Sequence, residues 1–213
     1  MIKMTKNSFI SKNHLNFNNT PEHMEFLDKH TIKLDKVLNK LDKFVLDFVK
    51  ILKKYSYYVI ISGYVSILFG RSRATEGIDL LVPKMNKKTF LKLFHDLNKK
   101  FECINSSKPD ELYNDYLLNN NAIRFSYRDK PIPNIEFKFA KTTMDYEALK
   151  QKLYVKMGSR ELIISSLELQ IAFKEEVLGS EKDIEDALHI RTVFEKNLNK
   201  NKLEHYKKIL KNE

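Results

Sequence analysis

The chain is poor in residues that crosslink or bend a backbone, with one cysteine, five prolines, five glycines and no tryptophan in 213 residues. The single thiol, Cys103, excludes an internal disulfide and fits a reducing compartment. No apolar run approaches the roughly 20 residues that a membrane-spanning helix needs. The first 19 residues lack the apolar block of a secretion signal. These absences predict a cytoplasmic protein that does not insert into membranes.

Negative charge is also scarce relative to positive charge. The chain has 38 Lys and Arg against 28 Asp and Glu, a net charge of +10. Such a balance favours polyanionic partners, namely nucleotides, RNA, DNA or acidic membrane surfaces. Much of the excess is lysine spread along predicted helices, so an ordinary solvated surface explains it equally well. With 42% hydrophobic residues, the chain can bury one core and carry a small helical appendage.

The pattern of apolar residues predicts a mixed α/β fold. Thr20-Pro21 predicts a short helix over 21–30, and the helical period of apolar residues predicts a long helix over 34–52. Strands are predicted at 57–62, 78–82, 122–127 and 134–140, and a hairpin over 153–164. Further helices are predicted at 64–69 and 86–100, after Ser165, after Ser180 and at 203–210. The Pro131/Pro133 segment is predicted as a turn.

This pattern divides the chain into three parts. Residues 1–33 form an N-terminal tail with the short helix, residues 34–164 an α/β core, and residues 165–213 a helical portion packed on that core. The core is predicted to have about five to six strands.

Three of the five glycines, Gly63, Gly70 and Gly77, fall seven residues apart around one predicted strand-helix-strand unit. Glycine that scarce and that concentrated indicates tight turns or close approach to a ligand. The first strand, the Ser62-Gly63 turn and the helix that follows direct backbone N–H groups and a positive dipole end to one point. Anions bind at such points, so this segment is the predicted site.

Charged side chains follow the turn. Arg71 and Arg73, two residues apart in a predicted loop, suit bidentate phosphate contacts. Asp79, on the next strand, suits a divalent cation that bridges to phosphate oxygens. A nucleoside triphosphate with Mg²⁺ needs all of these parts together. The alternative is a tight strand-helix corner with Asp79 paired to an arginine, because a short glycine motif also occurs without a ligand.

The order of these residues resembles a known superfamily. Gly63, Gly70-Arg71-x-Arg73-x-Thr75 and Ile78-Asp79-Leu80 resemble the nucleotidyltransferases that share the catalytic fold of DNA polymerase β. Within them, the chain is most similar to uncharacterised, mainly archaeal proteins related to abortive-infection and type IV toxin nucleotidyltransferases. A second match lies downstream, in the helix around Lys174 and in Lys182-Asp183-x-x-Asp186. The resemblance spans residues 34–194 and implies a mixed β-sheet flanked by helices, with a helical C-terminal portion.

The resemblance also implies roles for individual residues. The triphosphate would lie against Ser62, Gly63, Arg71, Arg73 and Thr75. Asp79 and Glu136 would hold Mg²⁺ or Mn²⁺, Lys174 would reach the triphosphate, and Asp183 and Asp186 would complete the helical side of the cleft. The implied activity is transfer of a nucleoside monophosphate from a nucleoside triphosphate to an RNA end or a protein side chain.

Three positions depart from the superfamily pattern: Tyr64 replaces a small residue of the turn, Glu136 is longer than the usual aspartate, and the third is position 77. Gly77 stands where the first aspartate of the metal-binding pair is expected, and two-metal transfer needs carboxylates that bridge cations about 3.5–4 Å apart. Glu76 points to the opposite face of the strand unless a bulge turns it. Gly77 therefore supports a second hypothesis, a catalytically inactive module that binds nucleotide or RNA or acts as a toxin–antitoxin-like partner. Plain RNA binding through lysine-rich helices is a third.

Four candidate residues have structural alternatives. Asp183 suits the N-terminal cap of a helix as well as a ligand role, and Asp186, one turn later, suits a solvated face. Lys174 lies among apolar residues, as a lysine with a buried stem does. Tyr64 lies in an apolar helix, so we expect it in the core rather than stacked on a base.

Overall fold

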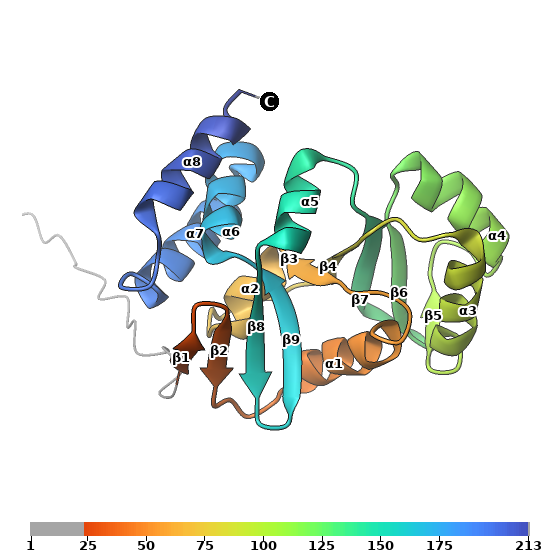
Figure 1. The fold of residues 1–213 in the computed structure, drawn as a ribbon. Coiled ribbons are helices and arrows are strands. Elements are labelled where there is room, and N and C mark those ends of the chain that lie inside the picture. The colour runs from red at the N-terminus through yellow and green to blue at the C-terminus, as the bar shows by residue number, and fades with distance from the viewer. Residues whose placement is uncertain (1–23, 213) are drawn as a thin grey trace, which may run out of the picture.

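The protein is described by a computed structural model for residues 24–212. Within them, nine strands form one mixed sheet in the order β1-β2-β8-β9-β3-β4-β7-β6-β5 (Figure 1). The strands are β1 (Met24–Asp28), β2 (Thr31–Leu34), β3 (Val59–Ile61), β4 (Gly77–Val82), β5 (Phe101–Cys103), β6 (Ile123–Tyr127), β7 (Lys130–Phe139), β8 (Lys152–Met157) and β9 (Arg160–Ser165).

Helices occupy the connections and the C-terminal portion. They are α1 (Lys40–Leu52), α2 (Gly63–Leu68), α3 (Lys87–Leu97), α4 (Pro109–Glu111), α5 (Thr143–Lys150), α6 (Leu167–Phe173), α7 (Glu181–Val193) and α8 (Lys200–Leu210). Two π-helical segments, η1 (Leu112–Tyr116) and η3 (Lys174–Leu178), and a 3₁₀ turn, η2 (Leu117–Asn119), complete the set. Helices α6, α7 and α8 gather at the opposite end of the sheet from β5 (Figure 1).

One face of the sheet is buried under α1 and α3. The ring centroid of Phe48 on α1 lies 5.5 Å from that of Phe125 on β6. On α3, the ring of Phe90 lies 6.5 Å from that of Phe137 on β7. Side chains alternate along a strand, so Glu136, next to Phe137, points to the opposite face. That opposite face carries the predicted site.

The sheet brings two distant segments of the predicted site side by side. Strands β4 and β7 pair in parallel, with Asp79 opposite Glu136 and Gly77 opposite Asn134. The mixed α/β fold predicted from the sequence is confirmed.

The N-terminal prediction was wrong where the structure can test it. Instead of a helix over 21–30, Met24–Asp28 is a strand that forms a hairpin with β2, and β2 pairs in parallel with β8. Tertiary packing favours the strand over the predicted helix, since the ring of Phe26 lies 5.9 Å from that of Phe194 in the core. The 1–19 tail and Thr20-Pro21 lie outside the described residues.

Other boundaries differ for local reasons. The helix predicted over 34–52 begins only at Lys40, because Asn39 and Asp42 form a capping box and Leu34 belongs to β2. Strand β7 includes Pro131 and Pro133, which lie beyond the end of its pairing with β4 and need no N–H there. The described sheet has nine strands rather than five to six, because β1, β2 and the short edge strand β5 were not predicted.

Candidate functional site

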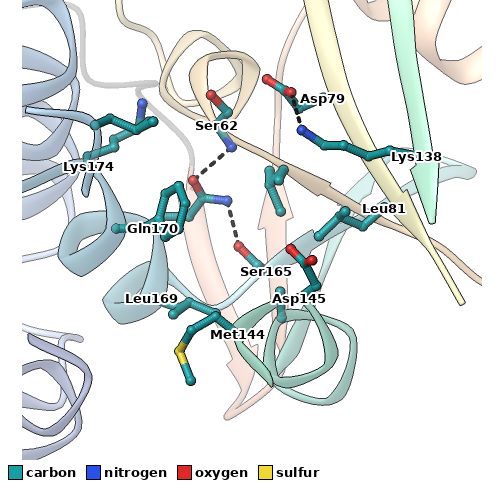
Figure 2. Close-up of a pocket in the computed structure, with 14 residues that line it drawn as sticks. Ser62, Asp79, Leu81, Lys138, Met144, Asp145, Ser165, Leu169, Gln170 and Lys174 are labelled. Carbon is teal, nitrogen blue, oxygen red and sulfur yellow. Dashed lines mark hydrogen bonds and ion pairs between the residues drawn. The ribbon is translucent and has the colours of Figure 1, made fainter. Parts of the chain in front are cut away.

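A cavity of about 200 Å³ opens on the sheet face opposite α1 (Figure 2). Strands β3, β4, β7 and β9 supply its floor, and helices α5 and α6 supply its walls. Its polar lining includes Ser62, Asp79, Lys138, Gln170 and Lys174. Its apolar lining includes Leu81, Met144, Ala148, Leu169 and Phe173. The predicted turn, the predicted carboxylate of β4 and the predicted lysine of the C-terminal portion therefore meet at one cavity.

Both predicted metal-binding carboxylates lie on this face, and each already has a cationic partner. Asp79 Oδ1 accepts a hydrogen bond from Lys138 Nζ at 2.8 Å (Figure 2). Glu136 Oε1 accepts one from Arg124 Nε at 3.2 Å. Lys138 follows Glu136 by two residues on β7, so alternation brings both side chains to the face of Asp79. The arrangement is a row of ion pairs rather than an open carboxylate pair.

The space beside Gly77 is taken by Glu136. A Cβ atom added to Gly77 would lie 3.3 Å from Glu136 Oε1 and 3.6 Å from Asn134 Oδ1. The longer side chain of Glu136 therefore fills part of the volume that an aspartate at position 77 needs. Within residues 24–212, no cluster of three or more His, Cys, Asp or Glu side chains is arranged to hold a metal ion. These side chains do not fit a two-metal centre.

The Ser62-Gly63 turn has an unusual backbone. Ser62 has φ 65° and ψ −142°, a region that costs a non-glycine residue about 1–3 kcal/mol. Its backbone N–H donates to Gln170 Oε1 at 3.0 Å, and Gln170 Nε2 donates to Ser165 Oγ at 2.5 Å (Figure 2). Gln170 thus holds the turn to α6 and β9. The N–H group expected to face a phosphate is bonded inside the protein.

Arg73 covers the glycine of this turn. A Cβ atom on Gly63 would lie 1.8 Å from Arg73 Nη2, so only glycine leaves room for the guanidinium. The same guanidinium binds both carboxylate oxygens of Asp186, with Nε at 3.1 Å and Nη2 at 3.0 Å. Arg73 therefore ties the turn to α7 and lies where the resemblance places the triphosphate.

Asp186 is the centre of a buried ion cluster. Its side chain is fully buried and also pairs with Arg71 Nη1 at 3.1 Å and Lys174 Nζ at 2.8 Å. Lys174, only 1% exposed, reaches Asp183 Oδ1 at 3.3 Å as well. Arg71, Arg73 and Lys174, which were predicted to bind phosphate, therefore lie together. In the structure they bind carboxylates of the protein.

The environment of Asp183 has opposing effects on its pKa. Burial raises the pKa, but the hydrogen bond from Ser180 and the charge of Lys174 outweigh burial, so the net pKa lies below its usual value. The backbone N–H of Asp183 also donates to Ser180 Oγ at 3.3 Å, as part of the N-terminal cap of α7. Asp183 therefore lies in the cap of α7, the structural alternative to a ligand role, and also pairs with Lys174.

Two further predicted residues have structural contacts. Thr75 Oγ1 donates to the carbonyl of Gly77 at 2.8 Å and so shapes the start of β4. Tyr64 is fully buried and donates its hydroxyl to Asp42 Oδ1 at 2.8 Å. The prediction that Tyr64 belongs to the core is confirmed. Burial, followed by the charge of Asp42, raises the pKa of Tyr64.

Lys138 and Gln170 are among the cavity residues that the sequence reasoning did not assign to the site. Lys138 had a usable signal, because it follows Glu136 by two residues and a strand places both on one face. Gln170 had none, since its contact with Ser62 spans 108 positions and no local pattern marks it.

Comparison with known proteins identifies the fold. No family model and no curated protein matches the sequence. An antigenic nucleotidyltransferase-like protein from Paracoccidioides brasiliensis has a similar structure, with a TM-score of 0.51 and 15% identity over 79% of this chain and 85% of that one. The chain has the nucleotidyltransferase fold. A second similar structure is the antibiotic-resistance factor ANT(2'')-Ia, with a TM-score of 0.51 and 16% identity over 80% of this chain and 93% of that one.

At these identities the likeness concerns the fold alone. It confirms the fold class that the motifs predicted. In residues 24–212, no helix combines the length and apolar character that crossing a membrane requires.

Proposed function

We propose that this nucleotidyltransferase-fold protein binds a nucleotide in its cavity without carrying out two-metal nucleotidyl transfer. The observation that carries the proposal is the 2.8 Å ion pair between Asp79 and Lys138, next to a glycine at position 77. A cation bound by Asp79 would have to displace the ammonium of Lys138. The hypothesis of an inactive binding module is thus favoured over the hypothesis of an active transferase.

The lining of the cavity supports a nucleotide as the ligand. Leu169 and Phe173 of α6, together with Met144 of α5, offer an apolar wall that suits a base. Lys138 offers a cation at the polar end, and its side chain is 31% exposed. An ammonium is a strong point charge for phosphate, so Lys138 would exchange Asp79 for a phosphate oxygen when the ligand binds.

A second candidate is Mg²⁺-dependent transfer of a nucleoside monophosphate to an RNA or protein hydroxyl. The register of β4 and β7 favours it, because Asp79 and Glu136 lie directly opposite one another with side chains 26% and 30% exposed. A toxin–antitoxin role and a relation to archaeal abortive-infection proteins rest on motif order alone.

Thermal unfolding with each of the four common ribonucleoside triphosphates, with and without Mg²⁺, tests the proposal. A ligand at about 100 times its dissociation constant adds about 2.7 kcal/mol to the free energy of unfolding. For a chain of this size, the Tm should then rise by about 5–10 °C. We expect this rise with at least one nucleotide in the absence of Mg²⁺. Lys138→Ala should abolish it, whereas Lys141→Ala, outside the cavity, should preserve it.

Two outcomes would overturn the proposal. A rise that requires Mg²⁺ and disappears in Asp79→Ala, together with incorporation of labelled nucleotide into an acceptor, would establish the transferase instead. No rise with any nucleotide, in protein that unfolds cooperatively, would exclude nucleotide binding at this cavity.

A further inference from the structure

A second surface lies on the same face of the sheet as the cavity, farther along β3, β9 and β8. Tyr154 on β8 lies opposite Ile163 of β9, whereas the neighbouring Ile164 lies opposite Ile60 of β3. Tyr154 therefore faces the same way as Ile61, which lines the cavity. Tyr57 lies two residues before β3, and its ring reaches this surface at Lys152. The β8–β9 hairpin projects from the body of the protein at the bottom of the view (Figure 1).

Two tyrosine rings and one lysine meet on this surface. Lys152 Nζ lies 5.5 Å from the ring centroid of Tyr57 and 5.9 Å from that of Tyr154. The side chain of Tyr57 is 53% exposed, an unusual state for a large aromatic residue next to an apolar sheet. Tyr57, before β3, and the outward side of the β8–β9 hairpin therefore present two rings and a cation together. On the inward side, Leu153 and Val155 are buried in the core.

The charge on this surface is positive. Within residues 24–212, Lys152 and Lys156 of β8 form no ion pair, and Lys156 lies opposite Lys33 of β2. The nearby carboxylates are already engaged, Asp35 with Lys33 at 3.6 Å and Glu161 with Lys53 at 3.6 Å.

A basic groove continues from Lys152. It has a volume of about 720 Å³ and runs between the β1–β2 turn, the start of β8 and the region before α8. Its cationic lining consists of Lys29, Lys152, Lys196 and Lys202. Its two carboxylates, Asp28 and Glu168, each accept a backbone N–H, at 2.7 and 3.0 Å. Lys152 belongs to both the aromatic surface and the groove, and the two together are called the strip below.

We infer that this strip binds single-stranded nucleic acid, with bases stacked on Tyr57 and Tyr154 and phosphates along the lysine-lined groove. Aromatic side chains beside a positively charged path are the combination that binds unpaired strands, because every base has a face that can stack. A duplex hides these faces, so it would use only the lysines. An acidic protein would likewise need the lysines but not the exposed rings.

Fluorescence anisotropy with labelled oligo(U) and oligo(dT) of about 12 nucleotides tests the inference on the full chain. Replacing either ring, in Tyr57→Ala or Tyr154→Ala, should weaken binding about tenfold. Tyr57→Phe and Tyr154→Phe should bind as the natural protein does, because stacking needs the ring and not the hydroxyl. Tyr146→Ala is the matched control, since this tyrosine of α5 is 50% exposed but has no contact with Lys152.

The salt dependence tests the phosphate path separately. The slope of log affinity against log salt should fall in magnitude by about 0.7 in Lys156→Ala, the value for one phosphate contact on a single strand. Lys88→Ala, on the surface of α3, should leave the slope unchanged. A preference for oligo(U) over oligo(dT) would assign the strip to RNA, and the reverse preference would assign it to DNA.

The inference is overturned if neither oligonucleotide binds at low salt. It is equally overturned if a duplex or heparin competes as well as the single strands while both alanine variants keep full affinity. In that case the surface would attract polyanions by charge alone. Each variant should first be shown to keep the natural Tm, so that lost binding is not lost folding.

Discussion

Substitutions at Gly77 and Glu136 should have energetically coupled effects on the stability of the fold. In Gly77→Asp, the new Cβ lies 3.3 Å from Glu136 Oε1, closer than ordinary van der Waals contact, so Glu136 has to move. The new carboxylate also joins Asp79 and Glu136 on one face. Overpacking of this kind costs about 1–3 kcal/mol, and a cost of 2 kcal/mol would lower the Tm of a chain this size by about 4–8 °C.

The double variant Gly77→Asp with Glu136→Asp should recover most of that loss. Shortening residue 136 by one methylene vacates the volume that the new aspartate needs. We expect a coupling energy of about 1–2 kcal/mol between the two positions, within the usual range for residues in contact. Gly77→Asn has the same size without the charge, so the difference between Asn and Asp measures carboxylate repulsion.

Calorimetric melting with and without Mn²⁺ or Mg²⁺ is the assay. Restoring the aspartate pair should make the Tm of the double variant rise with metal, and the Asn variant should show no such rise. The reasoning fails if Gly77→Asp alone is as stable as the natural protein, because Glu136 would then not fill the space. It also fails if shortening Glu136 gives no recovery.

Three further changes have defined outcomes. Asp186→Asn should lower the free energy of unfolding by about 3–5 kcal/mol in urea, because buried cations lose their carboxylate, whereas exposed Glu185→Gln should cost little. The folded-state pKa of Asp183 is depressed, so its contribution to stability is present above the unfolded pKa of about 4 and is lost as pH falls through the folded-state pKa. Urea midpoints measured between about pH 3 and pH 6 should show this loss of stability, and Asp183→Asn should make the pH dependence smaller. Gln170→Ala leaves the N–H of Ser62 without its acceptor and should cost about 1–3 kcal/mol in the same assay, while Gln170→Glu, which keeps an oxygen there, should cost less.

The elements predicted well are those in which local pattern and tertiary packing agree. Helices α1 and α3 carry regular apolar faces, and the β8–β9 hairpin turns at Gly158, which has φ 59°. The N-terminal hairpin was mistaken for a helix because Thr20-Pro21 is a local signal, whereas β2 is held by β8, more than a hundred residues away. Long-range pairing of this kind leaves no periodicity in the sequence near the strand itself.

Several residues of the predicted site lie close together in the structure, but the contacts between them were not predicted. The superfamily resemblance implied a common site for Asp79 and Glu136, and in the structure the pairing of β4 with β7 puts them opposite one another. Arg73 binds Asp186 because α7 packs against the loop that carries Arg73. The two residues are 113 positions apart, so no local spacing in the sequence predicts this contact. Alternation along β7 puts Lys138 on the face of Glu136, but its pairing with Asp79 also depends on the register between β4 and β7, which the sequence does not give.

The strand order also dictates when the sheet can be completed during synthesis. Strands β3 to β7 lie next to one another within residues 59–139, but β2 has no partner other than β1 until β8 is made. A two-stranded hairpin has little stability in water. The β1–β2 hairpin is therefore not stabilised until more than a hundred further residues have been synthesised. Closing so long a loop is entropically costly and slows folding. Docking of the N-terminal hairpin is therefore expected to be a late event, after the β8–β9 hairpin has emerged from the ribosome.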